Sequence, residues 1–429
     1  NAGEMGTNLI IVVNDNEMSI AENHGGLYQN LKELRDTEGR SSCNFFRSLG
    51  LDYLYVGEGN DIPSLIAAFA KVKDTSRPTV VHIHTQKGKG YAPAEADREE
   101  FHWEMPFDLE TGKPKVDCSG MEDYHSLTGK FLLEKMKEDH TVVAISSGTP
   151  TVIGFTPERR KQAGRQFVDV GIAEEHAVAL ASGIAAGGGH PVYGVYSTFI
   201  QRCYDQLSQD LCINGNPAVI TVFMGTVAGM NDVTHLGFFD IPLISNIPNM
   251  VYLAPTCSEE YFAMLEWAVR QTEYPVAIRV PGVAVVHRKE EFDTDYSELN
   301  RYKMTARGET VAILALGSFY DLGQALKNKL REESGVEATL INPRYITGLD
   351  EPMLEELKVG HRIVVTLEDG VLDGGFGEKI ARYYGNSEMR VLNYGLRKEF
   401  ADRYNLDELM KANRLTDKQM AEDIAGILG

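Results

Sequence analysis

Positive charge is scarce in this sequence. Its 42 lysines and arginines stand against 62 aspartates and glutamates, which gives a formal net charge of −20 at pH 7. Such a balance argues against nucleic acid or an anionic membrane surface as the main partner. No apolar run approaches the roughly 18 residues that a membrane span needs, and the first residues show no signal-peptide pattern. We therefore expect no membrane partner.

Cysteine is sparse as well. The five cysteines are odd in number, widely spaced and include no CxxC pair; they are Cys43, Cys118, Cys203, Cys212 and Cys257. This usage is typical of free thiols in a reducing cytoplasm rather than of a disulfide framework. The sequence also lacks a short internal repeat and any low-complexity tract.

Short apolar runs alternate with longer amphipathic stretches along the chain, which is the pattern of parallel sheets covered by helices. At 429 residues the chain is too long for one core. Polar, turn-rich segments at 104–123 and 284–308 indicate domain boundaries. We predict an α/β protein with three units of mostly parallel sheet, at 1–118, 119–300 and 301–429. The predicted strands are 8–13, 79–84, 142–145, 192–196, 218–223, 250–253, 311–316, 338–341 and 363–366.

Two short polar segments stand where parallel-sheet proteins bind ligands. Residues 14–20 (NDNEMSI) directly follow the apolar run 8–13, which we expect to be a buried parallel strand. Their amide and carboxylate oxygens then lie at the carboxyl end of a sheet. Residues 171–176 (GIAEEH) open an apolar, Ala- and Gly-rich helix with carboxylates in its first turn. The helix dipole alone would favour acids at that position.

These segments resemble the 1-deoxy-D-xylulose-5-phosphate synthase family, thiamine diphosphate enzymes of the transketolase superfamily. Further matching segments are YSTFIQRCYDQ (196–206), KGKGYAPAE (87–95), THLG (234–237), NPRYITGLDE (342–351) and TLEDGVLDGGFGEK (366–379). The resemblance covers almost the whole chain. It implies the later part of a diphosphate-binding domain at 1–118, a pyrimidine-binding domain at 119–300 and a transketolase C-terminal domain at 301–429.

The resemblance implies a magnesium site after the first strand. By it, the side chain of Asn16 and the carbonyl of Met18 hold Mg²⁺, which binds about six oxygens in octahedral array. Asn16 and Met18 would thereby bind the coenzyme diphosphate, with Lys87 in the matching glycine-rich segment. Taken alone, residues 14–16 would be turn formers that end a strand, and Lys87 would belong to a lysine-rich turn.

The coenzyme ring site is implied by the two other matching segments. Glu174 corresponds to the carboxyl that activates the aminopyrimidine ring, and such a group must be buried and partly protonated. Phe199 would stack on that ring, with Tyr196 and Arg202 beside it. Arg202 is therefore expected at both the coenzyme and the substrate. An isolated aromatic residue after a strand would more often belong to the core.

Two histidines match the substrate-binding histidines of the family. His235 in THLG and His102 in FHW would hold substrate oxygens and transfer protons, which suits a side chain that titrates near neutral pH. Each histidine alone would more often be a surface or satisfied residue. His82 and His84 share one face of a predicted strand, but without a third ligand nearby such a pair is usually structural.

The sequence departs from the family pattern at several places. No Gly-Asp-Gly motif precedes Asn16, so we expect either a fragment or a separate chain that supplies that half. The family's Asp-Arg-Ala-Gly reads FMGT at 223–226, and its Tyr-Pro-Arg-Gly reads VPGV at 280–283. Met224 and Gly282 thus replace two arginines that clamp the acceptor phosphate in the family. Arg202 or Arg279 would have to substitute.

One further position differs near the histidine. An aspartate of the family reads Asn231 here, with Asp232 beside it, and we expect Asn231 at the substrate. The resemblance implies a thiamine diphosphate- and Mg²⁺-dependent carboligase that takes a 2-ketoacid, which we expect to be pyruvate, and an aldehyde. A cytoplasmic homodimer is expected.

Three alternatives stay open at this point. A transketolase would move a two-carbon ketol unit between sugars, in a split subunit if two chains share the site. A 2-oxoacid dehydrogenase component would need a lipoyl partner. A non-catalytic subunit would only stabilise or regulate a partner, which the absent Gly-Asp-Gly motif favours and the presence of Glu174, Phe199 and His235 opposes.

Overall fold

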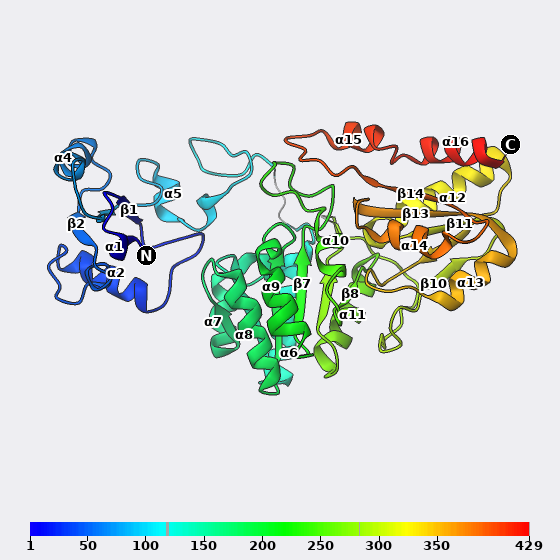
Figure 1. The fold of residues 1–429 in the computed structure, drawn as a ribbon, viewed down its shortest axis with the longest axis horizontal. Helices are drawn as coiled ribbons and strands as arrows, with labels where there is room; N and C mark the ends of the chain where they lie inside the picture. The colour runs from blue at the N-terminus through cyan, green and yellow to red at the C-terminus, as the bar shows by residue number, and fades with distance from the viewer. Residues whose placement is uncertain (117–119, 283, 429) are drawn as a thin grey trace. The chain divides into compact units, whose positions relative to one another are not determined.

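The computed structural model describes residues 1–116, 120–282 and 284–428, drawn as a ribbon in Figure 1. The chain divides into two compact units, Asn1–Met121 and Glu122–Gly429, and each is described by itself. Every strand packs in one of three sheets that are parallel apart from one pairing, with helices between the strands. The α/β prediction is thereby confirmed.

The first unit is built on a three-stranded parallel sheet in the order β1-β3-β2. Its strands are β1 (Ile10–Asp15), β2 (Asp52–Val56) and β3 (Thr79–His84), and its helices are α1 (Ala2–Met5), α2 (Gly26–Asp36), α3 (Phe45–Ser48), α4 (Ile62–Val72), α5 (Ala92–Ala96) and η1 (Glu100–His102).

The prediction that the first strand is buried is wrong. β1 pairs with β3 on one side and forms an edge of the sheet, and the side chain of Val12 is 47% exposed. The central strand β3 is buried along almost its whole length instead. An apolar run marks a strand in the sequence, but its place in the sheet depends on which strands pair with it.

The second unit contains a six-stranded parallel sheet in the order β5-β4-β6-β7-β9-β8. Its strands are β4 (Val142–Ser146), β5 (Phe167–Asp169), β6 (His190–Tyr196), β7 (Val219–Phe223), β8 (Val251–Leu253) and β9 (Val276–Arg279). Its helices are α6 (Tyr124–Glu138), η2 (Pro150–Ile153), α7 (Pro157–Ala163), η3 (Gly164–Gln166), α8 (Glu174–Ala186), η4 (Ile200–Cys203), α9 (Tyr204–Gln206), the π-helix η5 (Leu207–Cys212), α10 (Asp240–Ser245) and α11 (Ser258–Arg270).

A second sheet of the same unit has the order β10-β12-β11-β13-β14, with β10 antiparallel to β12. Its strands are β10 (Lys303–Ala306), β11 (Thr310–Ala315), β12 (Thr339–Asn342), β13 (His361–Val371) and β14 (Arg390–Leu396). Its helices are η6 (Gly317–Phe319), α12 (Tyr320–Ser334), α13 (Glu351–Gly360), α14 (Phe376–Tyr384), α15 (Leu406–Ala412) and α16 (Asp417–Leu428). One apolar cluster contains Tyr193 and Ala277 of the first sheet and Leu314 and Val364 of the second, so the two sheets share a core.

All nine predicted strands overlap observed ones, and β3 has the predicted bounds. The strands that the sequence analysis missed are short or lie beside polar residues: β2, β5, β9, β10 and β14. Four cysteines are free, as the sequence indicated, and Cys118 lies outside the described residues. Among the helices that the structure describes, none has the length and apolar character to cross a membrane.

Candidate active site

The carboxyl end of β6 carries an aromatic cluster. β6 is almost entirely buried, and the chain leaves it at Tyr196 to form the single turn η4. The ring of Phe199 packs edge-on against Tyr196 and His235, with ring centroids 5.6 Å away in each case. Phe199 thus joins the turn after β6 to the loop after β7. The structure brings three predicted site residues, Tyr196, Phe199 and His235, into one cluster.

Glu174 is the first residue of α8, and its position is set by the helix start. The helix has no side-chain N-cap, so a carboxylate in its first turn is favoured by the exposed backbone N–H groups. Glu174 is only 3% exposed, and Nη1 of Arg202 lies 3.0 Å from its Oε2. The side chain of Arg202 is 52% exposed. Two predicted residues therefore form one ion pair between a buried carboxylate and an accessible guanidinium.

His235 is oriented by a carboxylate three residues earlier. Its Nδ1 lies 3.0 Å from Oδ1 of Asp232, which also accepts from the Thr234 hydroxyl. Hydrogen bonds from Thr234 and His235 lower the pKa of Asp232 to about 2. Because an ionised carboxylate only accepts, Nδ1 of His235 carries the hydrogen of this bond, and Nε2 is the ring nitrogen that Asp232 does not engage. Asp232 is thus part of the site as the residue that fixes His235.

Arg279 does not have the geometry of a substrate ligand. It is 4% exposed, its Nε and Nη2 lie 2.7 and 3.2 Å from the two oxygens of Asp240, and Nη2 also donates to the carbonyl of Asp369. A buried guanidinium that is paired in this way cannot turn to a ligand without leaving Asp240 unpaired. The arrangement argues against the predicted substrate role of Arg279.

Asn231 lies in the same loop as His235 but faces another part of the chain. Its side-chain nitrogen donates to the carbonyl of Tyr404 at 3.0 Å, and its own carbonyl accepts from the backbone N–H of Arg403. These bonds give Asn231 a role in holding the loop. The expected contact of its amide with a substrate has no support in this geometry.

The two positions where the family arginines are replaced have left-handed backbone. Met224 directly follows β7 with φ 56°, and Gly282 after β9 also has φ 56°. A methionine is rare in this region, whereas glycine adopts it readily. Val283 lies outside the described residues. Neither side chain can bind an anion by charge, so Arg202 is the predicted substrate residue of this unit that retains an accessible guanidinium.

In the first unit, Asn16 and Met18 form a tight turn directly after β1. Oδ1 of Asn16 accepts from the backbone N–H of Met18 at 3.1 Å, and Glu17 between them has φ 69°. Lys87 donates to the carbonyls of Ser19 and Ile20, at 2.8 and 3.2 Å. The predicted lysine and the predicted metal-binding turn are therefore neighbours within this unit.

His102 and Lys87 influence each other electrostatically. Burial, followed by the charge of Lys87, lowers the pKa of His102. Burial also lowers the pKa of Lys87, while the carboxylate of Glu99 opposes this shift. The structure thus places Asn16, Met18, Lys87 and His102 in the first unit, and Glu174, Tyr196, Phe199, Arg202, Asn231, His235 and Arg279 in the second.

Asp15, the last residue of β1, stabilises the turn that follows the strand. The carboxylate is 5% exposed, its Oδ2 lies 2.5 Å from Nη1 of Arg35 and 2.9 Å from Nε2 of His82, and its Oδ1 accepts from the N–H of Glu17. Burial opposes ionisation of Asp15, but the bonds from His82 and Arg35 outweigh it and lower its pKa to about 2. His82 also meets the Tyr53 hydroxyl through Nδ1, so it has a structural partner on each side.

The donor atoms near β1 have the chemistry that magnesium requires. Oδ1 of Asn16 and the carbonyl of Met18 are neutral, hard oxygens on one turn, which fits part of a six-oxygen set that the coenzyme phosphates would complete. No group of three or more His, Cys, Asp or Glu side chains in the described part of the chain could hold a metal by itself. The residues therefore fit a metal that is shared with a ligand.

Comparison with known proteins finds three family models that match parts of the chain. The family model of the transketolase pyrimidine binding domain matches residues 122–285, and that of the transketolase C-terminal domain matches residues 301–420. A third model, 1-deoxy-D-xylulose-5-phosphate synthase, matches residues 1–44.

Curated relatives cover most of the chain. The 1-deoxy-D-xylulose-5-phosphate synthase of Lachnoclostridium phytofermentans is 33% identical over 97% of this chain and 73% of its own length. The synthase of Clostridium botulinum strain Alaska E43 is 32% identical over 97% of this chain and 72% of its length.

Solved structures share the fold at low identity. A split gene transketolase, described as an inactive beta4 tetramer, matches 72% of this chain and 98% of its own, with TM-score 0.59 and 20% identity. A transketolase of Pichia stipitis matches 99% of this chain and 72% of its own, with TM-score 0.57 and 15% identity.

The fold and the matched domains define a transferase of the transketolase type. Within that class, the chain belongs to the 1-deoxy-D-xylulose-5-phosphate synthase family.

Proposed function

We propose that this protein is a thiamine diphosphate-dependent carboligase that transfers the two-carbon unit of a 2-ketoacid, pyruvate, to an aldehyde. The observation that carries the proposal is the buried carboxylate of Glu174, paired with Arg202 in a unit that also presents Phe199 and His235 as one ring cluster. Family membership supports the reaction type. In the reaction the C1–C2 bond of the ketoacid breaks and CO₂ leaves. C2 then forms a bond to the aldehyde carbon.

The coenzyme, when bound, supplies the acidic carbon that accepts the ketoacid. Glu174 is the residue proposed to hold a proton against the aminopyrimidine ring, because burial favours the protonated carboxyl. Arg202 holds Glu174 in place at 3.0 Å. Phe199 offers its ring for stacking, and its edge-on contacts with Tyr196 and His235 fix that ring.

His235 is proposed to move the proton that the aldehyde oxygen gains when the new carbon–carbon bond forms. Its Nδ1 is engaged by Asp232, so Nε2 is the atom that exchanges the proton with substrate. In the first unit we propose that Asn16 and Met18 hold Mg²⁺, that Lys87 faces the diphosphate and that His102 handles a substrate oxygen. We also propose a cytoplasmic homodimer.

The acceptor is proposed to be an aldehyde without a phosphate. Met224 and Gly282 carry no charge, Arg279 is committed to Asp240, and Arg202 is paired with Glu174. An arginine–phosphate contact contributes on the order of 1.5–3 kcal/mol, so the loss of two such contacts should cost a phosphorylated acceptor two or more powers of ten in binding.

The test is product analysis with pyruvate, thiamine diphosphate, Mg²⁺ and either glyceraldehyde or glyceraldehyde 3-phosphate. Pyruvate-dependent CO₂ release together with a deoxyketose supports the carboligase, and a preference for glyceraldehyde supports the unphosphorylated acceptor. A strong preference for the phosphorylated aldehyde would contradict the argument from Met224 and Gly282. Ketol transfer between sugars without CO₂ release would indicate a transketolase, and no turnover with coenzyme bound would indicate a non-catalytic subunit.

A further inference from the structure

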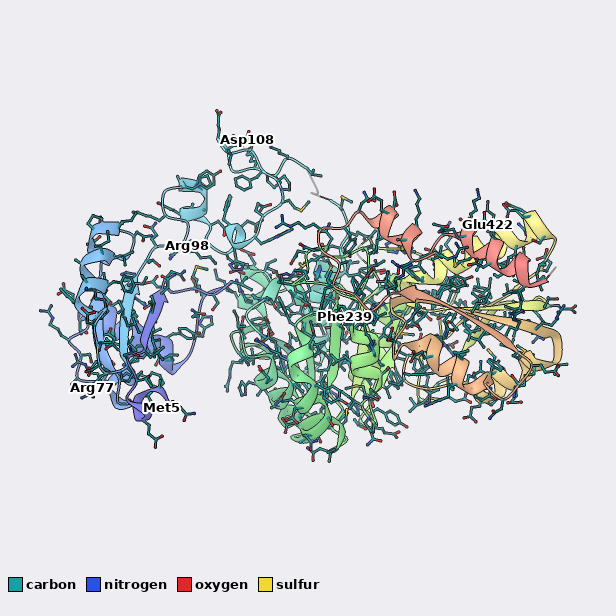
Figure 2. The ribbon with its side chains drawn as sticks, turned by 45° about the horizontal axis from the view of Figure 1, so that its top comes forward. Met5, Arg77, Arg98, Asp108, Phe239 and Glu422 are labelled. Atoms are coloured by element: carbon teal, nitrogen blue, oxygen red, sulfur yellow. The ribbon has the colours of Figure 1, made fainter. Side chains whose placement is uncertain are left out.

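The loop that carries His235 depends on a distant part of the chain for its shape. This His235 loop, residues 224–239, connects β7 to α10, and its stretch around Asn231–Thr234 is mostly exposed. Figure 1 shows the segment after β14 running back toward the loops that follow β7. Figure 2 labels Phe239 at the end of the loop, between the two sheets of this unit, and the Phe400 ring lies 5.8 Å from it.

The backbone N–H and carbonyl of Val227 are both hydrogen-bonded to residues of the C-terminal part of the chain, Asp369 and Tyr404. The N–H of Val227 donates to Oδ1 of Asp369 at 2.7 Å, and its carbonyl accepts from the Tyr404 hydroxyl at 2.6 Å. Asp369 is buried at the end of β13, where its other oxygen accepts from Ser318. The base of the loop is thereby fixed by residues more than 140 positions away in sequence.

Three more bonds hold the loop next to the histidine. The N–H of Arg403 donates to the carbonyl of Asn231 at 2.6 Å, and the Asn231 amide donates to the carbonyl of Tyr404. The N–H of Val233 donates to Oδ1 of Asp402 at 3.1 Å. Arg403 has φ 47°, a costly conformation for this residue that brings its N–H to the loop.

We propose that residues 402–404, here named the C-terminal clamp, position His235 for the proton transfer assigned to it above. This inference rests on the proposed function. The clamp touches neither His235 nor a ligand, so Asp402 and Tyr404 are positioning residues. They hold the backbone on both sides of Asp232, and Asp232 in turn orients the imidazole through Nδ1. Loosening the clamp leaves the chemistry in place and lowers the fraction of molecules whose His235 is aligned.

The test compares Tyr404→Phe and Asp402→Ala with two matched controls. Tyr394→Phe removes an equivalent hydroxyl from the same domain, one that donates to Asp423 at 3.0 Å. Asp402→Asn keeps an oxygen that can accept from Val233, so it is the conservative rescue of Asp402→Ala. Two experiments are done on the full chain. The first measures hydrogen exchange of the backbone amides at 226–236, and the second measures kcat and KM for pyruvate-dependent CO₂ release.

We expect Tyr404→Phe and Asp402→Ala to raise amide exchange at 226–236 and to lower kcat by about 3- to 10-fold, the effect of one lost hydrogen bond. KM should change less than twofold, and both controls should behave like the wild type. Unchanged exchange in both variants would overturn the clamp. Faster exchange with unchanged kcat would overturn its role in positioning.

Failure of the proposed function and failure of the clamp give different results. If the wild type releases no CO₂ from pyruvate, the proposed function fails, and with it the role in positioning. Exchange at 226–236 does not require turnover, so it still decides whether residues 402–404 hold the loop. A fall in kcat for Tyr394→Phe as large as that for Tyr404→Phe would also overturn the proposal, because the effect would then be general to the domain.

Discussion

Two buried carboxylates, one in each unit, make a direct comparison. Asp15 ends β1 in the first unit and Glu174 begins α8 in the second, and each is paired with an arginine. Asp15 is enclosed: Arg35 is almost buried, and His82 and the N–H of Glu17 complete its bonds. Glu174 is held by Arg202 alone among the contacts described above, and that arginine is half exposed.

The difference agrees with the proposal that Asp15 maintains structure and that Glu174 reacts. Enclosure by several donors stabilises the ionised form and leaves no geometry for a ligand. Glu174 is bonded instead to the half-exposed guanidinium of Arg202. Burial by itself therefore does not identify a catalytic acid; the number and the exposure of the partners do.

The largest expected effect is on Glu174. Glu174→Ala should lower pyruvate-dependent CO₂ release by about 100- to 10,000-fold, because it removes the proposed acid–base group, while the melting temperature stays close to that of the wild type. The measurement is turnover together with thermal unfolding. Glu175→Ala is the matched control, since Glu175 is the next residue of the same helical turn and is half exposed. Near-normal turnover of Glu174→Ala would refute its assignment.

Asp15→Asn should have the opposite profile, a loss of stability in the first unit. Breaking a buried ion pair and leaving Arg35 without its carboxylate costs about 3 to 5 kcal/mol. Native-state hydrogen exchange of β1 and β3 measures this loss. Asp52→Asn is the control, because Asp52 in the same sheet pairs with Arg77 at 3.5 Å on the surface, where about 1 kcal/mol or less is at stake. Equal effects of the two substitutions would contradict the comparison.

Glu368 on β13 sharpens the comparison as a third buried carboxylate, bound by the N–H groups of Phe376 and Gly377. Burial raises its pKa to about 7, against the effect of those bonds. Because folding raises the pKa, the stabilising contribution is complete below about pH 4.5 and is lost as the pH rises through 7. Between pH 4.5 and 8 the wild type should lose about 3 kcal/mol of unfolding free energy relative to Glu368→Gln. Urea unfolding at several pH values measures the difference, and parallel pH curves would contradict it.

The smallest effect is expected for Arg202, the accessible partner. Arg202→Gln should lower kcat/KM for pyruvate by about 3- to 10-fold by loosening Glu174, and should change stability by less than about 1 kcal/mol. Steady-state kinetics and thermal unfolding provide the two values. Arg202→Lys keeps the charge but not the planar fork, so an intermediate loss is expected. A loss of stability as large as that of Asp15→Asn would remove the distinction between the two pairs.

Much of the fold could be predicted because continuous apolar runs mark strands wherever they lie in a sheet. β3 and β7 were located in this way almost to the residue. The edge position of β1 could not be predicted, because it depends on pairing with β3 from nearly 70 residues later.

The candidate site could likewise be predicted only where sequence motifs mark it, and not where it depends on tertiary contacts. Tyr196, Phe199 and His235 were expected at one site because their segments resemble those of the family, and the structure brings the three rings together. Arg279 was expected at the substrate as a base that could replace the family's arginines, and its pairing with Asp240 is a tertiary contact. The clamp contacts of Asp402 and Tyr404 have no local signal at all, since they join segments about 170 residues apart.

That separation also sets when the His235 loop can take its final shape during synthesis. Tyr404 follows Val227 by 177 positions. At about 5–20 residues per second the ribosome needs roughly 10–35 s to add that length. During this interval the strands around β7 can pair and Glu174 can already be in place, while the His235 loop still lacks the residues that hold it. The His235 loop can therefore reach the shape described here only after residue 404 has been translated.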